Sequence, residues 1–311
     1  MSRIVSSKAF RTSLVTLIIV GTFGIFGWYI HTHPKTITTL MSISPIALVL
    51  LTVAYCLTIV ANALVLHFSL TYVKRSTPIF DNVLLTGYSS VVNFFGPLQS
   101  GPGFRAAYLK KKYGVELKKF FTATFIFYVF FALINVVVLA LASIQQYASL
   151  WRVFFLIGIC ALIALPFLVR FIRPTKLGNN VISTVRLKDR NLWLIGAGAL
   201  LLIIATCFAY YIELTQVSNS IGVGQVIVYT AAANLALFVS LTPGAIGFRE
   251  AFLVLSQRLH HIDTSVIVSA SIIDRAFYVV FLLALFAVLL IVHKYRRSLS
   301  IFRIKPGENE L

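Results

Sequence analysis

The sequence predicts an all-α polytopic membrane protein, with six spanning helices and two re-entrant helical hairpins arranged as an inverted repeat. Its composition is 59% hydrophobic and only 12% charged, with a mean hydropathy of +0.92, far more apolar than a soluble domain. The apolar residues form long runs separated by short basic loops. Two of these runs are broken by proline and glycine just before a Gly-Phe-Arg triplet, at residues 103–105 and 247–249.

The first half of the chain contains four apolar runs. Residues 14–30 follow Arg3, Lys8 and Arg11 without a small-x-small cleavage site, so we expect an uncleaved first helix, followed by a second at 43–66. If residues 79–98 crossed the membrane, the basic loops that follow would lie outside, against the positive-inside bias. We therefore expect a hairpin that enters and leaves on the cytoplasmic side, followed by an outward helix at 120–141.

The second half repeats this order with the opposite orientation. We expect spanning helices at 153–171, 192–212 and 266–292, and an external hairpin made of 221–241 and 245–259. This hairpin keeps the basic C-terminal tail cytoplasmic. Glu213 and the His260-His261 pair beside Asp263 mark expected helix boundaries.

Each half therefore reads helix, helix, hairpin, helix. We expect a single integral membrane domain over 1–311, with half-repeats at about 10–145 and about 150–295 and a cytoplasmic tail at 296–311. Inverted repeats with broken segments near the midplane are typical of alternating-access transporters. A bundle of eight complete spans is the alternative.

The formal charge of +18 follows this topology, because most of the 27 Lys and Arg residues fall on cytoplasmic loops. It indicates orientation and attraction for anionic lipid rather than nucleic-acid binding. We expect a multi-pass protein of the cell (inner or plasma) membrane with both termini in the cytoplasm. The three cysteines lie singly in apolar runs, and Walker, HExxH and Cys-x-x-Cys patterns are missing, so we expect no cofactor, no metal and no enzyme activity.

The two broken segments are the candidate substrate site. Half-helix ends leave backbone N–H groups unpaired, and glycines let a ligand approach them, so the expected ligand is an anion. Arginine binds phosphate through two parallel hydrogen bonds. The candidate substrate-binding residues are Arg105, Arg249, Arg275, Asn93, Gly101, Gly103, Gly244 and Gly247.

Two acidic residues accompany these arginines at membrane depth, where each charge costs about 2.5–3.5 kcal/mol. Glu250 and Asp274 are expected to balance charge or gate the site. Adjacent helical residues point in different directions, so Asp274 or another hairpin group is the expected partner of Arg249, rather than Glu250. Alternatively, these carboxylates only pin helices together, or they carry protons.

These segments also carry a family resemblance. Residues 243–251, residues 93–105 and the Arg-Ala-Phe-Tyr run at 275–278 are similar to the signature of the flippase-like integral membrane domain of lysylphosphatidylglycerol synthases, over about 11–293. The resemblance implies a lipid translocase that moves a lipid between leaflets. The soluble aminoacyl-transferase domain of the synthases is not expected in 311 residues, so their synthase activity is not carried over. Ala245 stands where the family commonly has glycine, which leaves the cargo open.

The predicted function is thus a flippase for a phosphate-bearing lipid, anionic or lipid-linked, that works by alternating access. The expected partner is membrane phospholipid or a lipid-linked substrate; the sequence does not define an oligomeric state. Two alternatives remain: a secondary carrier of a small soluble anion, and a non-transporting scaffold for an envelope-synthesis complex.

Overall fold

The described part of the chain is helical throughout. The computed structural model describes residues 43–75, 77–95, 100–145, 188–239 and 248–298. Its helices are α4 (Pro45–Tyr72), α5 (Ile79–Phe95), α6 (Ser100–Tyr113), α7 (Leu117–Gln145), α10 (Arg190–Val217), α11 (Val223–Val239), α12 (Phe248–Leu255), α13 (Gln257–His260) and α14 (Thr264–Ser298). The expected helices at 14–30 and 153–171 lie outside the described residues.

Four of these helices, α4, α7, α10 and α14, are long and apolar enough to cross a membrane. The protein is therefore a multi-pass helical membrane protein. Helices α7, α10 and α14 contain the runs expected from hydropathy and extend beyond them at both ends, whereas α4 begins two residues after its expected start at 43 and ends six residues after 66. In α14, for example, the helix continues through Lys294 and Arg297.

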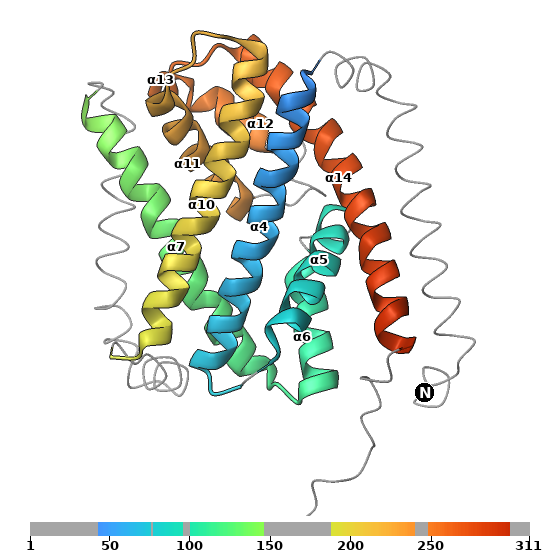
Figure 1. The fold of residues 1–311 in the computed structure, drawn as a ribbon. Coiled ribbons are helices and arrows are strands. Elements are labelled where there is room, and N and C mark those ends of the chain that lie inside the picture. The colour runs from blue at the N-terminus through green and yellow to red at the C-terminus, as the bar shows by residue number, and fades with distance from the viewer. Residues whose placement is uncertain (1–42, 76, 96–99, 146–187, 240–247, 299–311) are drawn as a thin grey trace, which may run out of the picture.

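Helices α4 and α10 lie side by side through the middle of the bundle (Figure 1). A Cβ added at Gly198 of α10 would lie 2.8 Å from Cγ2 of Val65 in α4, so only glycine allows the two helices to come this close. Both helices begin at a side-chain cap. Ser44 Oγ accepts from Ala47 N at 3.2 Å, and Asp189 Oδ1 accepts from Asn191 N at 2.9 Å.

The shorter helices form two groups at opposite ends of the bundle. Helices α5 and α6 pack against each other in the lower half of Figure 1, whereas α12 and α13 lie in the upper half, packed against α11. The residues that connect α5 to α6, at 96–99, and α11 to α12, at 240–247, lie outside the described residues.

The limb expected at 245–259 differs in detail from the structure. It contains two helices, because α12 ends at Leu255 and α13 begins at Gln257. At this break the Ser256 hydroxyl donates to the Leu253 carbonyl at 3.1 Å. α13 then ends at His260, and His261 has a left-handed φ of 54°, which confirms the helix boundary expected there.

Candidate functional site

A cavity of about 510 Å³ lies between the two groups of short helices, bounded by the long ones. Its lining is rich in polar groups for the interior of an apolar bundle. The polar lining residues are Thr58, Asn62, Thr86, Ser89, Ser90, Asn93, Thr206 and Asn234, and the charged ones are Arg105, Arg249, Asp274 and Arg275. Aromatic side chains, including Tyr55, Phe127, Tyr210 and Tyr278, cover much of the rest.

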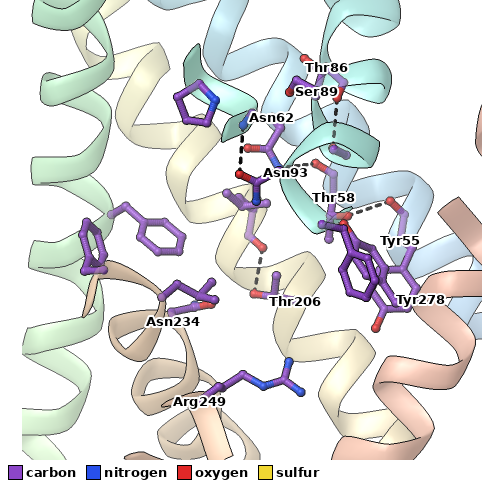
Figure 2. A pocket seen from close by; sticks show the side chains of 18 of the residues that line it. Tyr55, Thr58, Asn62, Thr86, Ser89, Asn93, Thr206, Asn234, Arg249 and Tyr278 are labelled. Carbon is purple, nitrogen blue, oxygen red and sulfur yellow. Dashed lines mark hydrogen bonds between the residues drawn. The ribbon is translucent and has the colours of Figure 1, made fainter. Parts of the chain in front are cut away.

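Two polar stripes supply one wall of this cavity. Thr86, Ser89, Ser90 and Asn93 recur at helical spacing along α5. Tyr55, Thr58 and Asn62 do the same along α4. Residues three and four apart share one helix face, so this signal was readable in the sequence. Of these residues only Asn93 was predicted as a site residue, and that prediction came from its place in the glycine-broken segment. Figure 2 shows these side chains opposite Thr206 and Asn234, with Arg249 at the far side of the opening.

Helix α6 begins at the cavity. Gly101 and Pro102 of its first turn line the cavity, so the positive end of the helix dipole lies there. The Gly101 N–H donates to Oδ1 of Asn93 at 3.3 Å, and a Cβ at Gly101 would lie 2.8 Å from both Asn93 Cβ and the Ser89 carbonyl oxygen. Glycine is therefore required at position 101.

Gly103 is placed differently from Gly101. A Cβ added there would have no heavy atom within 4 Å, and Gly103 is not among the residues that line the cavity. Gly244 and Gly247, the corresponding residues of the second segment, lie outside the described residues.

Arg105 lies one turn along α6 and brings a positive charge to the cavity lining. It forms no ion pair with any residue that the structure describes, and its Nε has no hydrogen-bond partner among them. An unpaired charge inside an apolar bundle is unfavourable. The guanidinium of Arg105 is therefore a strong donor that an anionic ligand in the cavity could pair with.

Arg249, in the first turn of α12, is in contrast paired. Its Nη2 lies 2.5 Å from Oδ2 of Asp274 in α14 and 3.4 Å from Oε1 of Glu250. Its Nη1 donates to the Tyr210 hydroxyl at 3.3 Å. The expected Arg249–Asp274 pair is confirmed, with only 5% and 6% of the two residues exposed.

Arg275, next to Asp274, pairs with Glu250 at 3.1 Å. The two ion pairs therefore cross-link α12 to α14, and both arginines still reach the cavity lining, whereas Glu250 does not. Each carboxylate thus lies against an arginine of the other helix, and the roles expected of the two carboxylates, in charge balance or gating, stay predictions.

Glu213 and Tyr55 also belong to this cluster and were missed as site residues. The Tyr55 hydroxyl oxygen lies 2.8 Å from Oε1 of Glu213 and 2.5 Å from Oδ1 of Asp274. Glu213 was interpreted as a helix boundary, but α10 continues to Val217 and leaves Glu213 only 1% exposed. No local signal in the sequence indicates contacts between residues so far apart.

Side-chain contacts join the start of α5 to the end of α6, at the end of this helix pair that lies away from the cavity. Asp81 accepts from Lys112 Nζ at 2.6 Å and from the Tyr113 hydroxyl. Burial lowers the pKa of Lys112, but hydrogen bonds to Asp81 and Tyr108 outweigh it and leave this pKa above its ordinary value. Burial and the hydrogen bond to Asp81 raise the pKa of Tyr113 to about 12. Both donors thus keep their protons at neutral pH and fix the position of α6.

Comparison with known protein families gives one finding. The family described as the lysylphosphatidylglycerol synthase TM region has a sequence model that matches residues 11–285. This match includes the cavity, both groups of short helices and the four long helices up to residue 285 of α14. A comparison with curated proteins finds none that matches this chain.

Proposed function

Because the chain belongs to the family of the lysylphosphatidylglycerol synthase TM region, we propose that it translocates a phosphate-bearing lipid, anionic or lipid-linked, between the leaflets of its membrane. The observation that carries this proposal is the position of Arg105. It lies at a polar cavity inside an apolar bundle, with no carboxylate partner among the described residues.

The chemistry of the cavity favours a phosphate group. Arg105 presents a planar guanidinium, which can bind two phosphate oxygens through parallel hydrogen bonds. The first turn of α6 adds the positive end of a helix dipole at the same place. Both features stabilise negative charge, and the neutral amides and hydroxyls of α4 and α5 add donors for the rest of a polar head group.

The dimensions favour a head group over a whole lipid. A cavity of about 510 Å³ lies within the range of roughly 300–1,000 Å³ typical of small-molecule sites. In this proposal the head group enters the cavity while the acyl chains stay in the surrounding hydrocarbon. The exposed apolar side chains of α4, α7 and α10 suit that contact with lipid.

The mechanism we propose is alternating access between two re-entrant hairpins. α5–α6 would enter from the cytoplasmic side and α11–α12 from the external side, within an inverted repeat of six spanning helices in the cell membrane. A phosphate in the cavity would compete with Asp274 for Arg249. Weakening of the Arg249–Asp274 pair would then loosen α12 from α14 and open the site towards the other leaflet.

Leaflet exchange in reconstituted vesicles tests this function. The labelled panel contains an anionic phospholipid, an aminoacylated phospholipid, a zwitterionic phospholipid and a phosphate-free glycolipid. We expect protein-dependent exchange of one or more phosphate-bearing lipids, lowered about 10- to 100-fold by Arg105→Met, the loss of a hydrogen bond to a charged group worth about 1.5–3 kcal/mol.

Two controls accompany this assay. Arg258→Met removes an arginine that is exposed on α13, and it should leave exchange at the wild-type rate. Uptake of inorganic phosphate into the same vesicles distinguishes a carrier of small soluble anions. Exchange no faster than in empty vesicles for every lipid would overturn the proposal.

A further inference from the structure

Beside the paired carboxylates Asp274 and Glu250 lies a further carboxyl group, that of Glu213, which forms no ion pair with an arginine among the described residues. Glu213 lies in the last turns of α10 and is 1% exposed, yet among the described residues no basic side chain lies within 4.0 Å of it. Its carboxyl contacts Tyr55, whose hydroxyl oxygen lies 2.8 Å from Glu213 Oε1. The same oxygen lies 2.5 Å from Oδ1 of Asp274.

These two contacts need more hydrogens than tyrosine has. A tyrosine hydroxyl carries one hydrogen, which it can donate to a single acceptor at full strength. Both oxygen–oxygen distances are those of complete O–H···O hydrogen bonds, and two ionised carboxylates offer only acceptors. One of the two carboxyl groups must therefore supply the second hydrogen.

The ion pairs identify which carboxyl group does so. Asp274 lies 2.5 Å from the guanidinium of Arg249, and this contact stabilises its ionised form. Glu213 has no such contact and is the more deeply buried of the two. Glu213 thus donates its hydrogen to the Tyr55 oxygen, and the Tyr55 hydroxyl donates to Asp274.

We propose that Glu213 is a proton-binding site, neutral in the conformation seen here, whose occupancy sets the net charge of the cavity. The charged and titratable groups around it are Tyr55 of α4, Tyr210 of α10, Tyr229 of α11, Arg249 of α12, and Asp274 and Arg275 of α14. Helix α7 carries charge only at Lys118 and Lys119, near its opposite end. Glu213 lies four residues before the end of α10, about 6 Å along the helix axis.

This site links proton binding to anion binding, a step that rests on the proposed translocation. With Glu213 neutral, Asp274 and Glu250 balance Arg249 and Arg275, and Arg105 gives the cavity a net positive charge. Loss of the proton would place a negative charge on Glu213, beside the charge of Asp274. The added charge would hold Arg249 more strongly and repel an anion from the cavity. Because linkage is reciprocal, an anion in the cavity raises the affinity of Glu213 for its proton.

Infrared spectroscopy of the full chain in lipid nanodiscs tests the proton site directly. Only a protonated carboxyl shows the carbonyl stretch of a carboxylic acid. At neutral pH we expect this band in the wild type, its loss in Glu213→Gln, and no change in Glu116→Gln, in which an exposed, ionised glutamate is replaced. Tyr55→Phe should keep the band but move it to higher wavenumber, because the acid loses its hydrogen-bond acceptor.

Absence of the band from the wild type, or its survival in Glu213→Gln, would overturn the proposal. Failure of Glu213→Gln to fold would also count against it, since glutamine is a close mimic of the neutral acid. In that case the shift in Tyr55→Phe remains as the independent readout.

Exchange rates at several pH values then separate this inference from the function itself. We expect wild-type exchange to fall as pH rises through the titration of Glu213, and Glu213→Gln to respond little to pH. Wild-type exchange that is indifferent to pH would remove the coupling and leave translocation in place. No exchange at any pH would remove translocation, while the infrared band would still decide the proton site.

Discussion

Arg105 of α6 and Arg249 of α12 occupy similar places in the sequence but differ in their surroundings. Arg249 is held by Asp274 and Tyr210, whereas Arg105 has no ion-pair partner among the described residues. The repeated Gly-Phe-Arg triplet predicted both as substrate-binding residues; both line the cavity, and substrate binding itself stays a prediction. It could not distinguish them, because the partner of Arg249 comes from another helix.

Replacement of Arg105 should separate stability from transport. Arg105→Met removes a half-buried cation but keeps an apolar stem of similar length, so we expect the free energy of unfolding to rise by about 1–3 kcal/mol, the penalty of an unsatisfied polar group away from water. Thermal unfolding in detergent measures this change against the exposed Arg258→Met. A clear loss of stability would show that Arg105 has a structural partner.

Removal of the Asp274 charge should have the opposite effect. Asp274→Asn removes the 2.5 Å ion pair of buried Arg249 and leaves its longer contact with Glu250 at 3.4 Å, and breaking one side of a buried ion pair costs about 3–5 kcal/mol. The double variant Arg249→Met/Asp274→Asn should recover much of that loss, because no isolated charge remains. Unfolding measurements on all three variants check this, and additive losses would contradict the pairing.

At the scale of elements, the apolar run expected at 79–98 corresponds to α5, and after a break near residue 100 the chain begins a second helix, α6. The Gly-Pro-Gly sequence indicated that break, and the basic residues after it predicted a return to the same side. Hydropathy could not predict how the two ends are joined. The Gly101 N–H to Asn93 contact and the Asp81 to Lys112 pair depend on side-chain geometry that emerges only when the helices pack.

The two glycines of α6 provide a matched test of this packing. Gly101→Ala places a Cβ 2.8 Å from Asn93 Cβ and Ser89 O, so we expect a loss of about 1–3 kcal/mol, typical of overpacking. Gly103→Ala meets nothing within 4 Å and should be neutral, or stabilising by up to about 1 kcal/mol through helix propensity. Equal unfolding temperatures for the two variants would contradict the close contact at Gly101.

At the scale of the whole molecule, the four long helices were predicted well because each is a continuous apolar run. The Tyr55, Glu213 and Asp274 cluster was not, since its members are separated by 158 and 219 positions. A charged residue near the end of a hydropathy run is usually a boundary. Glu213 is buried instead because Tyr55 and Asp274 from two other helices surround its carboxyl.

The membrane orientation predicted from the basic loops can be tested by thiol labelling from each side of the membrane. Lys111 of α6 and Arg258 of α13 lie on the two groups of short helices at opposite ends of the bundle (Figure 1). In a version lacking the native cysteines, we expect Lys111→Cys to react with an impermeant thiol reagent only from the cytoplasmic side. Arg258→Cys should react only from outside, and reaction of both from one side would contradict the topology.

The measurement that tests the central claim most directly is photocrosslinking with two versions of one phosphate-bearing lipid. A photoactivatable group on the head group should label peptides that contain Asn93, Gly101 or Arg105, whereas the same group on an acyl chain should label the lipid-facing sides of the long helices. Arg105→Met should abolish the first pattern and leave the second. Labelling of the long helices alone by both probes, unchanged by Arg105→Met, would show that the cavity does not hold the head group.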